Sequence, residues 1–80
     1  MIKLNKQVEN LESIIEKIEA KIEALEEKKE AIFDNACEHD RDITDAEYRR
    51  IEKIDEQIEE LEEEADSIQN AIDYLRDYAD

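Results

Sequence analysis

The chain has 80 residues, of which 46% are charged, and its 26 acids against 11 bases give a formal net charge of -15. This length allows one small domain, and the absence of glycine excludes a phosphate-binding loop built on glycine turns. A single cysteine excludes an intramolecular disulfide framework. No apolar run approaches the roughly 18 residues of a membrane span, and strong acidity disfavours direct binding to nucleic acid or anionic lipid.

Residues 3–36 are expected to form one helix, because their apolar side chains recur at alternating steps of three and four. This spacing places them in a stripe along one helix face, which is the seam of a coiled coil. Lys29 fills one slot of the seam, where a polar side chain either sets the alignment of the helices or extends its charged end to solvent. The apolar members are Leu4, Val8, Leu11, Ile15, Ile18, Ile22, Leu25, Ile32 and Ala36.

Residues 37–43 interrupt this repeat, and we expect a turn there. If the first repeat continued, most of its slots would be polar or charged, whereas the next apolar repeat begins one residue out of step, at Ile51. The first helix is expected to end near residues 35–37, where Asn35 is suited to a left-handed cap. So short a connection predicts an antiparallel helical hairpin.

Residues 44–79 are expected to form the second helix. Thr44 and Glu47 have the spacing of a capping box, in which each side chain bonds the backbone N–H of the other residue. Ile43 and Tyr48 flank the cap at the positions of a hydrophobic staple. The second seam comprises Ile51, Ile54, Ile58, Leu61, Ala65, Ile68, Ile72, Leu75 and Ala79.

These elements predict an all-α fold, an antiparallel two-helix coiled-coil hairpin that dimerises into a four-helix bundle. One seam in a chain of this size supplies a core worth only about 3–5 kcal/mol, and several large apolar residues lie off the seam. Self-association is therefore expected, with a monomeric hairpin as the alternative. The expected oligomer contacts are Ile14, Phe33, Tyr48, Tyr74 and Tyr78.

Negative charge is concentrated in the second half. Residues 1–36 hold 6 Lys and 9 acids, a net of -3, whereas residues 37–80 hold 5 bases and 17 acids, a net of -12. Acids occupy eight of the twelve positions from 55 to 66. Three interpretations stay open: solubility of a good helix former, a docking face for a basic protein, or mimicry of nucleic acid. The candidate docking residues are Glu19, Glu26, Asp55, Glu59, Glu62, Glu63 and Asp66.

No catalytic, cofactor-binding or metal-binding site is expected. Cys37 and His39 supply two soft ligands where structural zinc needs four. Asp40 and Asp42 begin a calcium-loop spacing that then lacks the glycine and glutamate of an EF-hand. Carboxylates abound, but nothing predicts a cleft that would tune one of them for acid–base catalysis.

The stretch RDITDAEYRRIEKIDEQIEELEEEADSI, residues 41–68, resembles the N-terminal scaffolding (delta) coiled coil of tailed-phage major capsid proteins. In composition the chain also resembles small acidic phage inhibitor proteins. These resemblances imply a phage-type protein, and the start MIKLNKQVEN, which lacks the apolar core of a signal peptide, predicts a cytoplasmic location, in the host if phage-encoded.

The function expected is that of a non-enzymatic protein-binding module, an inhibitor or adaptor. It would occupy a basic surface of its partner, which is expected to be a basic or nucleic-acid-binding protein. The alternatives are an oligomerising scaffold or assembly factor, and a nucleic-acid mimic that inhibits a host defence enzyme.

Overall fold

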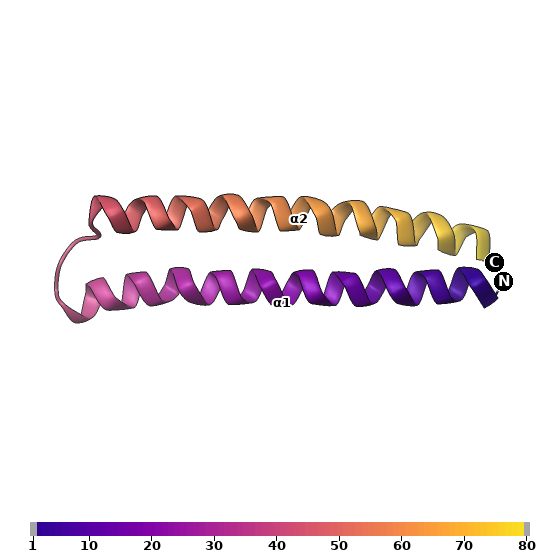
Figure 1. The fold of residues 1–80 in the computed structure, drawn as a ribbon, viewed down its shortest axis with the longest axis horizontal. Coiled ribbons are helices and arrows are strands. Elements are labelled where there is room, and N and C mark those ends of the chain that lie inside the picture. The colour runs from indigo at the N-terminus through magenta and orange to yellow at the C-terminus, as the bar shows by residue number, and fades with distance from the viewer. Residues whose placement is uncertain (1, 80) are drawn as a thin grey trace.

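The hairpin consists of two long antiparallel helices. The computed structural model describes the backbone of residues 2–79 and the side chains of residues 5–78. Helix α1 (Ile2–Glu38) and helix α2 (Asp45–Ala79) are joined by residues 39–44, so α1 begins at the end of the molecule where α2 finishes (Figure 1). The molecule measures 58 × 16 × 13 Å. The expected helical hairpin is confirmed, and the described residues contain no strand.

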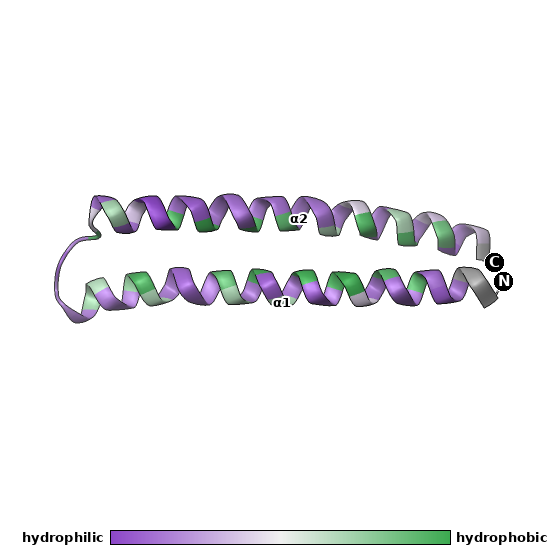
Figure 2. Ribbon diagram, in the orientation of Figure 1, coloured by the Kyte–Doolittle hydropathy of each residue, from purple (hydrophilic) through white to green (hydrophobic). Residues whose placement is uncertain are grey.

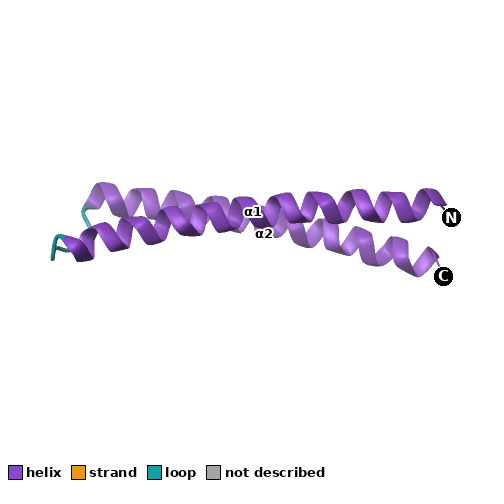
Figure 3. Ribbon diagram, turned by 90° about the horizontal axis from the view of Figure 1, so that it is seen from below, coloured by secondary structure: helices purple, strands orange, loops and turns teal. Residues whose placement is uncertain are grey.

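The core is the single seam that the two helices share. Every described seam residue from Val8 to Leu75 is buried or half-buried, with Ile72 the most enclosed at 1% exposed. Apolar residues recur along the helices at this spacing (Figure 2), and the helices cross at a shallow angle (Figure 3), as packed coiled-coil helices do. The side chains of Leu4 and Ala79, which were expected to extend the seam, lie outside the described residues.

Helix α1 ends later than expected, and the left-handed residue is Asp40 (φ 49°) rather than Asn35. Aspartate tolerates this conformation better than most residues, and it occupies the position beyond the helix that glycine fills in a Schellman motif. The two bonds of that motif run from Arg41 N–H to the Ala36 carbonyl and from Asp40 N–H to the Cys37 carbonyl, both at 3.1 Å. Asn35 therefore remains inside the helix.

His39 closes the last turn of α1. Its backbone N–H donates to the Asn35 carbonyl at 3.2 Å, and its ring Nδ1 lies 2.8 Å from the same oxygen. A carbonyl can only accept, so Nδ1 carries the proton in this bond. The exposed imidazole thus gives a carbonyl in the last turn of α1 a second hydrogen bond.

Helix α2 begins with the expected capping box. Glu47 N–H donates to Thr44 Oγ1 at 3.1 Å, and Thr44 N–H donates to Glu47 Oε1 at 3.0 Å. The Thr44 carbonyl accepts the first helical bond, from Tyr48 N–H at 2.9 Å. Ile43 is half-buried beside the cap, whereas Tyr48 is 58% exposed.

Candidate protein-interaction surface

The seam divides the surface of the hairpin into two flanks. One flank is lined by residues that come directly after a seam residue in the sequence, and this flank is strongly acidic. We call Glu12, Glu19, Glu26, Asp55 and Glu62 the acidic flank; all five are exposed. Two ion pairs cross between the helices on this side. Arg76 Nη2 lies 3.4 Å from Glu12 Oε2, and Lys29 Nζ lies 2.7 Å from Asp55 Oδ1.

Lys29 leaves the seam to reach Asp55. Its side chain is 34% exposed and that of Asp55 is 52% exposed, so the pair lies at the edge of the core. The lysine stem covers the seam while the ammonium group reaches a carboxylate of the opposite helix. Asp55 is therefore already paired within the chain, whereas no cation lies within 4 Å of Glu19, Glu26 or Glu62 in the part that the structure describes.

The outer face of α2 continues the negative surface. Glu59, Glu63 and Asp66 are all exposed there. Glu56, Glu59, Glu60 and Glu63 surround a shallow hollow of about 160 Å³. Glutamates four residues apart on a helix repel one another by roughly 0.2–0.5 kcal/mol per pair, so this face costs the helix stability.

Glu47 is the one charged side chain of the described residues that is buried, at 6% exposed. Arg41 donates two hydrogen bonds to its carboxylate, from Nη1 to Oε1 at 2.7 Å and from Nη2 to Oε2 at 3.2 Å. The Arg41 guanidinium, followed by the Thr44 backbone N–H, lowers the pKa of Glu47 to about 2, and the same bond raises the pKa of Arg41. Arg41 also donates to the Asp42 carbonyl at 3.1 Å, a bond within the turn, while its bonds to Glu47 tie the turn to the start of α2.

This ion pair was not predicted from sequence, although a signal existed. Position 47 lies four residues before Ile51 and so falls on the next slot of the second seam. A carboxylate in a buried slot needs a counter-charge, and Arg41 is the base nearest to it in the preceding turn.

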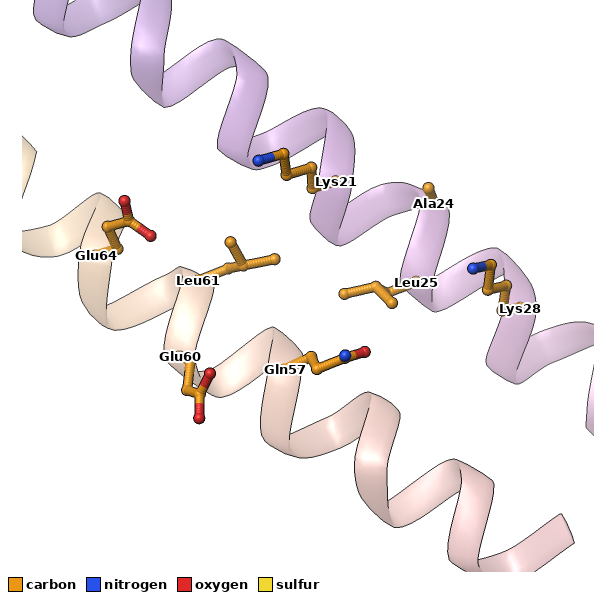
Figure 4. A pocket seen from close by; sticks show the side chains of 8 residues that line it. All are labelled: Lys21, Ala24, Leu25, Lys28, Gln57, Glu60, Leu61 and Glu64. Atoms are coloured by element: carbon orange, nitrogen blue, oxygen red, sulfur yellow. The ribbon is translucent and has the colours of Figure 1, made fainter.

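The opposite flank is hollowed, and we call it the groove flank. One hollow of about 430 Å³ lies midway along the hairpin between rims of polar side chains, with Leu25 and Leu61 pointing toward each other across it (Figure 4). A second, also about 430 Å³, lies nearer the turn, and a third of about 280 Å³ lies toward the open end. Their apolar members are seam residues: Leu25 and Leu61, Ile32 and Ile54, and Leu11 and Leu75.

The five expected oligomer contacts are all exposed, and they do not lie together. Ile14 (40%) and Tyr78 (66%) each follow a groove-lining leucine by three residues, which puts them on the groove flank. Phe33 (41%) follows Ile32 by one, on the acidic-flank side, and Tyr48 (58%) lies near the turn. Tyr74 pairs with Tyr78, with ring centroids 4.9 Å apart, and its hydroxyl donates at 3.4 Å, which raises the pKa of Tyr74.

Of the four turn residues considered as metal ligands, three border one hollow and the fourth bonds the backbone. Cys37, Asp40 and Asp42 border an open hollow at the turn, while the His39 ring is bonded to the backbone. Within the described residues, no three His, Cys, Asp or Glu side chains are grouped so as to hold a metal ion.

Within residues 2–79, neither helix contains a stretch long and apolar enough to cross a membrane. Comparison with protein families, with curated proteins and with solved structures gives no significant match to this chain.

Proposed function

We propose that this chain is a non-enzymatic protein-binding module that occupies a basic surface of a partner protein with its acidic flank and the outer face of α2. The observation behind the proposal is that these carboxylates are exposed and take no part in the seam. Of the seven residues expected from sequence, Asp55 alone pairs with a cation of this chain among the described residues. The other six are Glu19, Glu26, Glu59, Glu62, Glu63 and Asp66.

The energetics support a binding role for this charge. Repulsion along α2 opposes folding, and a basic partner would relieve it on binding, so part of the electrostatic cost becomes a driving force for association. Charged surfaces of this kind accelerate encounter with an oppositely charged partner and select against acidic ones. The module would serve as an inhibitor or an adaptor, in the cytoplasm and in a phage-type setting, as the resemblance of residues 41–68 implies.

Nucleic-acid mimicry is one specific form of this proposal. Eight carboxylates in the twelve residues from 55 to 66 spread over about 17 Å of helix, or about one charge per 2 Å. Duplex DNA carries about one per 1.7 Å. A protein that binds nucleic acid would meet a comparable charge density on α2, which makes a nucleic-acid-binding enzyme of host defence a suitable partner class.

A scaffold or assembly factor is the second candidate, and exposed aromatic side chains favour it. Phe33 and Tyr48 lie near the turn, at the other end of the molecule from Tyr74 and Tyr78. Apolar contacts at both ends of a rod would join copies into assemblies larger than a dimer. Such assemblies would resist salt, whereas binding through carboxylates would weaken as salt screens it.

The test compares two variants with the same change in charge. One carries Glu59→Gln, Glu62→Gln, Glu63→Gln and Asp66→Asn on α2; its control carries Glu9→Gln, Glu16→Gln, Glu23→Gln and Glu30→Gln on the exposed outer side of α1. Immobilised wild-type protein is expected to retain a defined set of basic proteins from lysate at low ionic strength and release them at high ionic strength. The control should retain the same set and the α2 variant should lose it. Equal retention by both variants, or release that ignores salt, would refute the proposal.

A further inference from the structure

The groove flank carries opposite charges on its two rims midway along the hairpin. Lys21 and Lys28 stand on the α1 rim of the central hollow, and Glu60 and Glu64 stand on its α2 rim (Figure 4). Within the described residues, none of these four side chains pairs with an opposite charge of this chain within 4 Å. Their charges are available to another molecule.

The floor between these rims is apolar and incompletely covered. Leu25 and Leu61 are half-buried although they belong to the seam, and Ala24 is exposed on the rim beside them. Small rim residues such as Ala24 let another helix approach closely. Covering this floor would remove apolar surface from water at about 25 cal/mol per Å², and the floor extends into the hollows on either side.

We infer that a second copy of this chain covers the groove flank, with the turns of both hairpins at the same end. A two-fold axis parallel to the helices sets the α1 rim of each copy against the α2 rim of the other. Lys21 then lies between the heights of Glu60 and Glu64 of the second copy, and symmetry repeats this contact. Every neighbouring pair of helices in the resulting four-helix bundle is antiparallel.

The opposite arrangement, with the turns at opposite ends, is disfavoured by charge. It sets α1 against α1, so that Lys21 and Lys28 meet the lysine rim of the second copy. Like charges brought together at an interface disfavour association. In the same-end dimer the turn-side hollow adds no ion pair, because Lys28 and the uncharged Ala31 of one copy meet Arg50 and Lys53 of the other, so the attraction comes from the central hollow.

The same-end dimer also covers exposed apolar residues near the open end. Ile14 and Tyr78 lie on the groove flank, beside Leu11 and Leu75 of the third hollow. The second copy brings its own Ile14 and Tyr78 to this height. Phe33 and Tyr48 stay outside the interface, so the inference assigns to the dimer only part of the exposed apolar surface.

Charge reversal tests the contact directly. Lys21→Glu places an acid where the contact needs a base, and Glu60→Lys with Glu64→Lys places bases where it needs acids. Each variant alone is expected to dimerise at least about tenfold more weakly than wild type by sedimentation, because like charges then face each other. An equimolar mixture is expected to recover a dimer containing one copy of each variant, because every rim then meets its opposite. A mixture that stays as weak as its components overturns the inference.

Replacing one of two alanines of α1 by glutamate locates the interface without changing the seam. Ala24→Glu puts a charge on the groove rim, whereas Ala20→Glu puts the same charge elsewhere on the exposed surface of α1. Ala24→Glu is expected to give a monomer of unchanged helicity by circular dichroism, and Ala20→Glu to remain a dimer. Equal effects of the two would place the contact elsewhere.

The single cysteine reports the orientation. Cys37 is exposed near the turn. With a spin label on Cys37 of each copy, pulsed electron paramagnetic resonance measures the distance between the two labels of a dimer. Turns at the same end predict a distance below half of the 58 Å length of the hairpin. A distance close to the full length would show opposed hairpins and overturn the inference.

This inference rests on the self-association expected from the sequence and is independent of the acidic docking surface. A monomer at every concentration overturns the dimer and leaves partner binding by α2 as a separate question. Conversely, a same-end dimer whose α2 variant still retains basic proteins would remove the proposed function and keep the dimer.

Discussion

At the scale of single residues, the turn holds the most specific chemistry in the chain. Arg41, Thr44 and Glu47 form one bonded group that satisfies the start of α2 and encloses a carboxylate. Buried charged groups are stable only when a counter-charge and hydrogen bonds replace water, and Glu47 has both. The group thus fixes where the chain reverses, which in turn sets how the two seams align.

The ionised form of Glu47 should stabilise the fold only above the acidic range. Its pKa in the folded chain is about 2, below the usual value of about 4.3, so its contribution is complete above the usual value and is lost as pH falls through about 2. Glu47→Gln is therefore expected to lower the free energy of unfolding at neutral pH, with a deficit that shrinks toward pH 2. Urea titrations at several pH values measure it, with Glu56→Gln on the exposed face of α2 as the control. A deficit that did not change with pH would contradict this role.

The left-handed Asp40 offers a gain in stability. A residue with a side chain is strained at φ 49° and glycine is not, so Asp40→Gly is expected to raise the free energy of unfolding by up to about 1 kcal/mol. Asp40→Val should lower it, since a branched side chain crowds the backbone there. Asp42→Gly, where φ is not positive, should give no gain, because glycine adds freedom to the unfolded chain. A gain from both glycines would rule out the strain as the cause.

At the scale of the helices, the alignment of α1 on α2 depends on seams that are regular except at Lys29 and Glu47. Both exceptions are charged, and both find partners, Asp55 and Arg41. The two differ in burial. The charged end of Lys29 lies at the edge of the core, whereas the carboxylate of Glu47 is enclosed. One apolar residue is thus missing from the α1 side of the seam.

Filling that slot should stabilise the hairpin. Lys29→Ile buries an apolar side chain worth roughly 1.5–3 kcal/mol and gives up an exposed ion pair worth about 0.2–1 kcal/mol. A net gain of about 1 kcal/mol in the free energy of unfolding is expected from urea titration. Lys17→Ile, on the exposed face of α1, should give none. A loss of stability at position 29 would mean that the Lys29–Asp55 pair contributes more than an exposed pair does.

At the scale of the whole molecule, charge is distributed unevenly around an apolar seam. The acidic flank and the outer face of α2 carry much of the surplus behind the net charge of -15, while the groove flank carries lysines and arginines together with Glu60 and Glu64. In the proposed contacts, the acidic side would bind a basic partner and the groove flank, with charges of both signs, would bind a second copy. The two proposed contacts use opposite flanks, so a dimer would leave the acidic surfaces open.

Added salt should raise the stability of the free protein, although it should weaken a complex with a basic partner. Screening reduces repulsion among the carboxylates of α2, while the seam is indifferent to salt. The midpoint of thermal unfolding is therefore expected to rise between low and high sodium chloride, at a protein concentration held constant. The variant with four neutralised acids on α2 should respond less than wild type. A midpoint that fell with salt would show that ion pairs such as Arg41–Glu47 outweigh the repulsion.

The two helices, the seam and the cap at Thr44 could be predicted from the amino-acid sequence, because periodicity and capping are local properties of the chain. The sequence predicted the break, yet placed the left-handed residue at Asn35, since the cap position depends on which carbonyls the Arg41 and Asp40 N–H groups reach. The enclosure of Glu47 by Arg41, the pairing of Asp55 with Lys29, and the gathering of Lys21, Glu60 and Glu64 around one hollow became visible only in the folded hairpin. These depend on which residues two helices bring to the same height, and that follows from packing between distant parts of the chain.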